Sequence, residues 1–104
     1  MNQINNVQGI TKIIMSPIAY TKCKLGQDWY ENKLTVEFIP DSYYPDYTEV
    51  TNWLMKNIDG QELNIEDVVD NLYQFLSVNY CPKHLKITDC ITNCKTHFDV
   101  IVEK

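Results

Sequence analysis

The hydrophobic pattern of the chain predicts two strands, then two helices, then two further strands. Apolar, β-favouring residues fill positions 18–23 after Pro17, and apolar and polar residues alternate over positions 33–39. Alternation with a period of two is typical of a strand with one buried face. Gly26-Gln27-Asp28 lies between the two segments and has the composition of a turn. These features predict a β-hairpin.

Two amphipathic helices are predicted in the middle of the chain. Asp46 and Glu49 have the spacing of a capping box, so the first helix is expected from Asp46 to about residue 59. Gly60 can end that helix, and Asn64 can cap the second. The expected apolar stripes are Tyr47, Val50, Leu54 and Ile58 in the first helix and Ile65, Val68, Val69, Leu72, Phe75 and Leu76 in the second.

Two further alternating runs predict a C-terminal hairpin. The first contains Leu85, Ile87 and Ile91, and the second contains Phe98, Val100 and Val102; residues 93–95 join them. The order ββααββ predicts an α+β domain in which two helices cover one face of a four-stranded antiparallel sheet. The two edges of such a sheet need cover, and pairing between subunits into a homo-oligomeric ring is one solution.

The length of 104 residues predicts a single domain over positions 1–104, with residues 1–12 as a loose arm. The nine basic residues are all lysines, and the net charge is −5. Without arginine and without a basic excess, a role in coating nucleic acid is disfavoured, although a lysine patch could still contact a phosphate. Residues 1–8 do not resemble a signal peptide, and no apolar segment approaches the roughly 20 residues that span a bilayer. We therefore expect a cytoplasmic protein with free thiols and no membrane partner.

Several segments resemble the 7-cyano-7-deazaguanine (preQ0) reductase family. They are Cys23-Lys24-Leu25-Gly26-Gln27-Asp28, the run LTVEFIPD at positions 34–41, Asp46, and Asn64-Ile65-Glu66-Asp67. Enzymes of this family have the tunnelling fold (T-fold) that they share with GTP cyclohydrolase I and pyruvoyltetrahydropterin synthase. The order of elements predicted above is the order of that fold. The resemblance also implies ring assembly, with the region around Cys23 facing Glu66 of a neighbouring subunit.

The resemblance implies roles for four side chains. Cys23 matches the catalytic nucleophile, and Asp28 matches the catalytic acid in a loop that is two residues shorter and lacks the family's proline. Glu66 matches the glutamate that anchors the substrate, whereas the family's preceding histidine is replaced by Ile65. Asp46 stands where the family has a substrate-binding glutamate.

The cofactor region departs from the family. The reductases carry a Ser-Lys-Ser-Leu-Lys run associated with NADPH, and positions 47–51 here read Tyr-Thr-Glu-Val-Thr. A crenarchaeal archaeosine synthase that resembles the reductases lacks the run and uses ammonia to form an amidine. NADPH reduction to the aminomethyl product and ammonia addition therefore both stay open. The substrate could be a free 7-deazaguanine base or one within nucleic acid, although the acidic composition disfavours a large tRNA.

The residue types suit this chemistry. A thiolate such as that of Cys23 can attack a nitrile carbon to form a thioimide, while the nitrogen takes up a proton. Asp28, five residues away across a tight turn, could supply that proton if partial burial near Trp29 keeps it protonated. Glu66 at a helix start would stay ionised and could accept two hydrogen bonds from a guanine-like edge.

Each of these residues also has an ordinary structural interpretation. Cys23 could be a packing residue, Asp28 a turn residue, Asp46 a helix cap and Glu66 a first-turn helix charge. A non-catalytic T-fold module that binds a purine- or pterin-like ligand is the competing function. The departures at Asp46, at Ile65 and at positions 47–51 support it.

A zinc site is a further hypothesis. Its four ligands would be Cys81, His84, Cys90 and Cys94. Because Cys90 falls in a predicted strand and Cys94 at a hairpin tip, we expect ordinary thiols and no metal. His97 is expected on a surface or sheet face.

Overall fold

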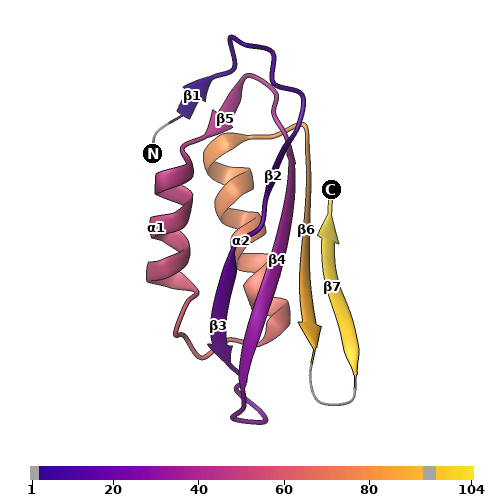
Figure 1. The fold of residues 1–104 in the computed structure, drawn as a ribbon. Helices are drawn as coiled ribbons and strands as arrows, with labels where there is room; N and C mark the ends of the chain where they lie inside the picture. Colours follow the sequence, from indigo (N-terminus) through magenta and orange to yellow (C-terminus); the bar gives the residue numbers. More distant parts are fainter. Residues whose placement is uncertain (1–2, 93–95) are drawn as a thin grey trace.

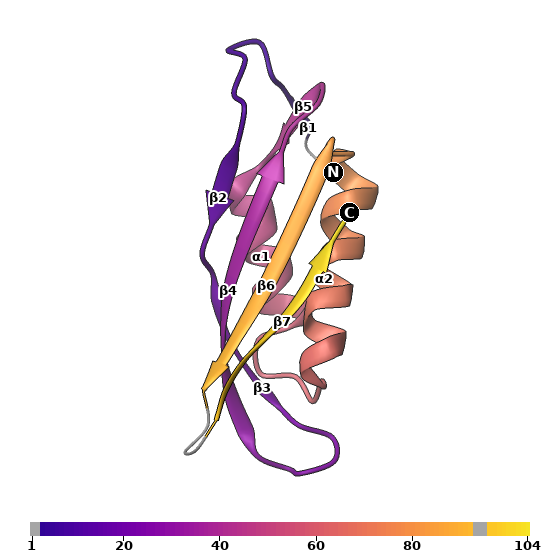
Figure 2. The same ribbon diagram turned by 90° about the vertical axis from the view of Figure 1, so that its right-hand side faces the viewer.

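One antiparallel sheet carries two helices on one of its faces (Figure 1). The computed structural model describes residues 3–92 and 96–104. Its elements are β1 (Gln3–Asn5), β2 (Ile13–Met15), β3 (Ile18–Lys22), β4 (Trp29–Ile39), β5 (Tyr43–Pro45), α1 (Tyr47–Asn57), α2 (Ile65–Tyr80), β6 (His84–Thr92) and β7 (His97–Glu103). In the view of Figure 2, β4 and β6 pass in front of α1, and α2 lies to their right. The predicted α+β class and order of elements are confirmed.

The main sheet has the order β2-β4-β6-β7, and β3 pairs with the same edge of β4 as β2. The first predicted strand, at positions 18–23, corresponds to β3 alone, and β2 is an additional strand before Pro17 in the same row, so the sheet has five strands in four rows. The break falls around Pro17, which has no N–H to donate. The carbonyl oxygen of Pro17 still accepts a hydrogen bond from the Leu34 N–H at 2.9 Å.

The N-terminal residues are held more firmly than the predicted loose arm. β1 pairs antiparallel with β5, with Ile4 opposite Tyr44. The side chain of Asn6 closes the following turn by accepting a hydrogen bond from the Ile10 N–H at 2.8 Å and donating one to the Ile10 carbonyl at 2.9 Å. The prediction is thus wrong for β1, because a three-residue strand is too short to show a hydrophobic period.

The core lies between the helices and the sheet, as the two hydrophobic periods predict. Asp46 begins α1, since its Oδ1 accepts a hydrogen bond from the Glu49 N–H at 3.2 Å. The predicted helix stripes are buried except at Ile65, which is half-buried, and at Tyr47, where the prediction is wrong because the side chain is 50% exposed. The predicted C-terminal hairpin is present as β6 and β7, and its joint at residues 93–95 lies outside the described residues.

The helix-covered face of the sheet also buries three polar side chains: Thr21, Asn32 and Asp89. The amide nitrogen of Asn32 donates to the Thr21 hydroxyl at 2.8 Å and to the Ala19 carbonyl at 3.1 Å. Asp89 is fully buried, and neither of its carboxylate oxygens has a hydrogen-bond partner among the described residues. Burial raises the pKa of Asp89 to about 7.

This raised pKa predicts a stability that falls as the pH rises. The folded protein holds the Asp89 proton up to a pKa of about 7, whereas an unfolded aspartate loses it near pH 3.9. The contribution of the Asp89 proton to the free energy of unfolding is therefore complete below about pH 4 and is lost as the pH rises through 7. From pH 5 to pH 8 the wild type should lose about 2 to 3 kcal/mol of unfolding free energy relative to Asp89→Asn.

Urea denaturation at both pH values measures this difference. Asp70→Asn, which alters an exposed carboxylate on α2, is the control and should keep the wild-type pH dependence. Equal pH dependence in the wild type and Asp89→Asn would contradict the buried, protonated carboxyl.

Candidate active site

A short loop joins β3 to β4 and carries Cys23 and Asp28. The Cys23 N–H donates to the Asp28 carbonyl at 2.8 Å, and the Gln27 N–H donates to the Cys23 carbonyl at 3.0 Å. The predicted turn is therefore present, and Gln27 adopts a left-handed conformation in it, with φ of 61°. The two backbone hydrogen bonds hold Cys23 and Asp28 at the base of one loop.

The start of α2 is attached to this loop through Asn64. Its Oδ1 accepts a hydrogen bond from the Lys24 N–H at 3.3 Å and lies 3.9 Å from the Cys23 sulfur. Lys24 Nζ lies 3.9 Å from Asp67 Oδ2, which is in the first turn of the same helix. Asn64 does occupy the N-cap position, as predicted, but its side chain binds the loop and caps no helical N–H.

The connection between the two helices covers the outer edge of β3. Lys22 donates to the Gln61 carbonyl at 2.9 Å and accepts from the Leu63 N–H at 3.0 Å. The Gly60 N–H donates to the Tyr20 carbonyl at 2.7 Å. Gly60 adopts a φ of 78°, in the left-handed region that favours glycine. These hydrogen bonds fix the end of β3 relative to α2.

The Cys23 sulfur is half-buried between two polar groups. The Gly26 N–H lies 3.5 Å from Sγ, and Asn64 Oδ1 lies 3.9 Å from it. The thiol is therefore held in place by hydrogen bonds and still partly open to solvent, as attack on a ligand requires.

Three of the four predicted site residues lie at this end of the subunit. Asp28 contacts Cys23 through its backbone, but its side chain is exposed, and Trp29 is 59% exposed. The burial that we expected Trp29 to give Asp28 is thus absent within one subunit. Glu66 is exposed in the first turn of α2, between two residues that contact the Cys23 loop. Within one subunit this turn lies at the same end as Cys23, and a Glu66 from a neighbouring subunit facing the Cys23 region stays a prediction.

Asp46 lies at the opposite end of the subunit. It begins α1, which runs for 11 residues, or about 16 Å, before the chain reaches the connection that borders β3 (Figure 1). The structure therefore does not bring Asp46 to Cys23 within one subunit. Its observed contact, with the Glu49 N–H, is that of a helix cap.

The four-ligand zinc hypothesis is wrong for the residues that the structure describes. His84 and Cys90 lie six residues apart on β6, which separates them by about 20 Å. Cys81 ends α2 beside His84 and not beside Cys90. Cys94 lies outside the described residues. His97 is exposed on β7, as expected.

A cavity of about 420 Å³ lies between the β2–β3 segment and α1. Tyr47, Val50 and Thr51, which match part of the reductases' NADPH run, contribute to its wall. The other lining residues are mostly apolar and include no lysine, and the chain has no arginine. One subunit therefore offers no cation at this cavity for the phosphates of a nicotinamide cofactor, and the residues present do not fit NADPH.

Within the described part of the chain, no helix is long and apolar enough to cross a membrane. No family model matches the chain, and no curated protein matches it. Solved structures, in contrast, are similar to it over most of its length. An apo archaeosine synthase QueF-Like aligns with a TM-score of 0.78 and 17% identity, covering 91% of this chain and 94% of the other.

A second structure, described as a dihydroneopterin aldolase (FolB) from Vibrio cholerae, aligns with a TM-score of 0.74 and 16% identity. That match covers 92% of this chain and 98% of the other. At these identities the similarity shows the fold alone. Together with the order of elements, it shows that the chain has the tunnelling fold.

The role of Asn64 in holding the Cys23 loop can be tested by substitution. Asn64→Ala removes the acceptor for the Lys24 N–H, so the loop should loosen and iodoacetamide should alkylate Cys23 faster than in the wild type. The loss of one such hydrogen bond should cost about 0.5 to 1.5 kcal/mol of stability. Peptide mass spectrometry measures the alkylation of each cysteine separately.

Asn71→Ala, at an exposed position on α2, is the matched control and should leave the Cys23 rate unchanged. The same rate at Cys23 in all three proteins would show that Asn64 does not hold the loop.

Proposed function

We propose that this protein is a nitrile-processing enzyme of 7-deazaguanine metabolism and that Cys23 attacks 7-cyano-7-deazaguanine. The observation that carries the proposal is the placement of the Cys23 sulfur: it is half-buried, faces the Gly26 N–H at 3.5 Å and lies beside the first turn of α2. The similarity of the fold to the archaeosine synthase QueF-Like structure supports the same substrate class.

In the proposed reaction, the sulfur of Cys23 bonds to the nitrile carbon. One of the two C–N π bonds breaks, the nitrogen gains a proton, and the product is a covalent thioimide. The thiol proton and the new N–H proton balance, so the adduct has the mass of the protein plus that of the whole nitrile. Asp28, at the base of the same loop, is the proposed proton donor to the nitrogen.

Glu66 is the proposed acceptor for the guanine-like edge of the base. A carboxylate accepts two hydrogen bonds from adjacent N–H donors. Its neighbours Asn64 and Asp67 both contact the Cys23 loop, which places Glu66 at the same end of the molecule. Asp46 could take part in substrate binding only from a neighbouring subunit.

The fate of the thioimide defines the product. Attack by ammonia on the thioimide carbon would release the thiol and leave an amidine, with no cofactor. Reduction to the aminomethyl product would instead require NADPH. The lysine-free cavity beside Tyr47 and Thr51 favours ammonia, and we derive no step through NADPH.

The alternative is a non-catalytic module that binds a purine- or pterin-like ligand. The exposed side chains of Asp28 and Glu66 favour it, because a single subunit leaves the carboxylates in water. The similarity to a structure described as a dihydroneopterin aldolase is consistent with this class of ligand. The two functions differ in one observable, which is a covalent bond to Cys23.

Intact-protein mass spectrometry after incubation with 7-cyano-7-deazaguanine, without NADPH or ammonia, tests the proposal. The wild type should gain the mass of the whole nitrile once per chain, because no later step can release the adduct. Cys23→Ala should gain nothing, and Cys81→Ala, which removes an exposed thiol elsewhere, should react like the wild type. A folded wild type without an adduct would contradict the mechanism and favour the binding module.

Assembly is a second prediction, because one subunit leaves the site open. Within the subunit β3 is covered by the helix connection, whereas β2 and β7 are the outer strands of the sheet order. Leu85 and Lys104 form a pair that exchanges both backbone hydrogen bonds. In an antiparallel sheet, hydrogen-bonded pairs alternate with pairs that are not hydrogen-bonded, and Thr88 and Ile101 form one of the latter. The Ile101 N–H therefore points away from β6. We propose that β7 pairs with a neighbouring subunit and that a homo-oligomeric ring results.

Light scattering tests this assembly. The wild type should have a molar mass several times the 12.2 kDa of the chain, and Ile101→Pro should shift it to the monomer by removing the outward N–H. Ile101→Thr keeps that N–H and should remain assembled. A monomeric wild type at working concentration would contradict the ring.

A further inference from the structure

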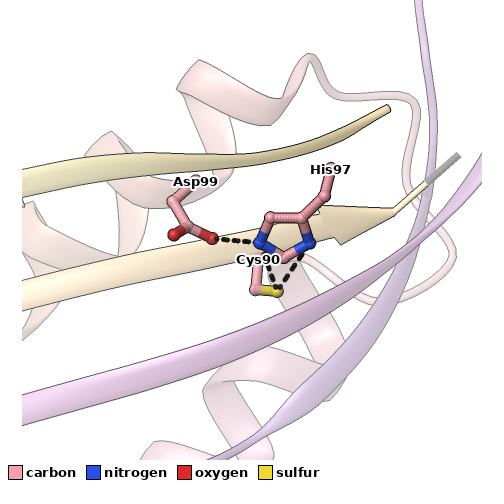
Figure 3. Close-up of side chains that lie close together, drawn as sticks. All are labelled: Cys90, His97 and Asp99. Carbon is pink, nitrogen blue, oxygen red and sulfur yellow. Dashed lines mark hydrogen bonds and ion pairs between the residues drawn. The ribbon is translucent and has the colours of Figure 1, made fainter. Parts of the chain in front are cut away.

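Three side chains that can bind a metal meet on the sheet face opposite the helices, far along β6 from His84. They are Cys90 of β6 and His97 and Asp99 of β7 (Figure 3). The strand register places Cys90 opposite Asp99 and Thr92 opposite His97, so neighbouring strands supply all the groups. The ligand atoms lie within 4.8 Å of one another.

We propose that Cys90, His97 and Asp99 form a binding site for a divalent transition metal, with zinc as the best match. Thiolate and imidazole ligands are those that zinc prefers, and carboxylate is its third common ligand. This inference does not rest on the proposed function, and its ligands are separate from Cys23, Asp28 and Glu66.

The distances between the side chains suit a common ion. Nε2 of His97 lies 3.2 Å from Asp99 Oδ1 and 3.7 Å from the Cys90 sulfur. Ligand atoms around a tetrahedral zinc ion at usual bond lengths are separated by roughly 3.3 to 3.6 Å. The sulfur lies almost as close to Nδ1, at 3.8 Å, so the imidazole would rotate to direct Nε2 at a shared ion.

Thr92 supports the orientation of the imidazole. Its Oγ1 lies 3.1 Å from Nδ1 of His97, so it can accept the Nδ1–H hydrogen bond. In the neutral tautomer that carries its proton on Nδ1, this bond leaves Nε2 without a proton and free to bind a metal. Metal-binding histidines are usually fixed in this way by an acceptor on the other ring nitrogen.

The charges around the site favour a cation overall. Asp99 and the nearby Glu31 are negative, whereas Lys33 is positive and lies opposite Cys90 on β4. The Cys90 thiol loses its proton when it binds a metal. The Lys33 ammonium lies 3.5 Å from a Glu31 carboxylate oxygen, which partly neutralises it. Glu31, Lys33, Cys90 and Thr92 surround a cavity of about 180 Å³. Three protein ligands beside a cavity leave a fourth coordination position for water or a small ligand, as in catalytic zinc sites.

Cobalt substitution tests the proposal on the full-length protein after treatment with a chelator. Co²⁺ should bind once per chain and give a thiolate-to-cobalt charge-transfer band, and Zn²⁺ should displace it. Cys90→Ser should abolish the band, and His97→Gln and Asp99→Asn should each weaken Zn²⁺ binding at least 10-fold in competition with a chromophoric chelator. Thr92→Val should weaken it by about 10-fold, the effect typical of a group that orients a ligand.

Cys23→Ser and His84→Gln are the controls, and both should keep the wild-type affinity. Circular dichroism establishes that every variant is folded. The absence of a charge-transfer band in the wild type, or its persistence in Cys90→Ser, would overturn the site. So would full affinity in Asp99→Asn together with loss of binding in Cys94→Ser, because the ligand set would then be different.

Discussion

The hydrogen bonds between β3 and the connection of the two helices determine the arrangement of the rest of the molecule. A sheet edge exposes unpaired N–H and C=O groups, and here residues 59–63 satisfy those of Tyr20 and Lys22. The helices cannot slide along the sheet without breaking these bonds. The start of α2 is therefore held beside the end of β3, and the Asn64 side chain meets the Cys23 loop.

This constraint gives the two faces of the sheet different roles. The helix-covered face contains the apolar core and, at the same end as Cys23, the buried polar side chains of Asn32 and Asp89. A buried carboxyl without a partner is costly unless it stays protonated, so the core loses stability as the pH rises. The opposite face is mixed: it exposes Ile14, Ile18 and Ile101, and it carries ion pairs such as Lys12–Glu37, at 2.7 Å, and the cluster around Cys90.

Much of the fold could be predicted from the sequence because each long element has a clear hydrophobic period. The alternation over β4 and the stripes of α1 and α2 identify the elements and the buried face. The pairing of β1 could not be predicted in this way, since three residues carry no period. The break at Pro17 was visible, but only the pairing of both β2 and β3 with β4 shows that one strand row continues across it.

The candidate site was predicted in part. Cys23, Asp28 and Glu66 lie at one end of the subunit, whereas Asp46 lies at the other because α1 separates them. The role of Asn64 was missed because a helix cap is the usual function of an asparagine at that position. The meeting of Cys90 with Asp99 depends on the register between β6 and β7, which hydrophobic alternation alone does not determine.

The central claim is a bond between the Cys23 sulfur and a nitrile carbon, and carbon NMR observes that bond directly. The protein would be mixed with 7-cyano-7-deazaguanine labelled with ¹³C at the nitrile carbon, in the absence of NADPH and ammonia. The account predicts that the bound signal moves from the nitrile region to that of a thioimide carbon, and that Cys23→Ser gives no thioimide signal. A bound ligand whose labelled carbon keeps its nitrile shift in the wild type would contradict the account.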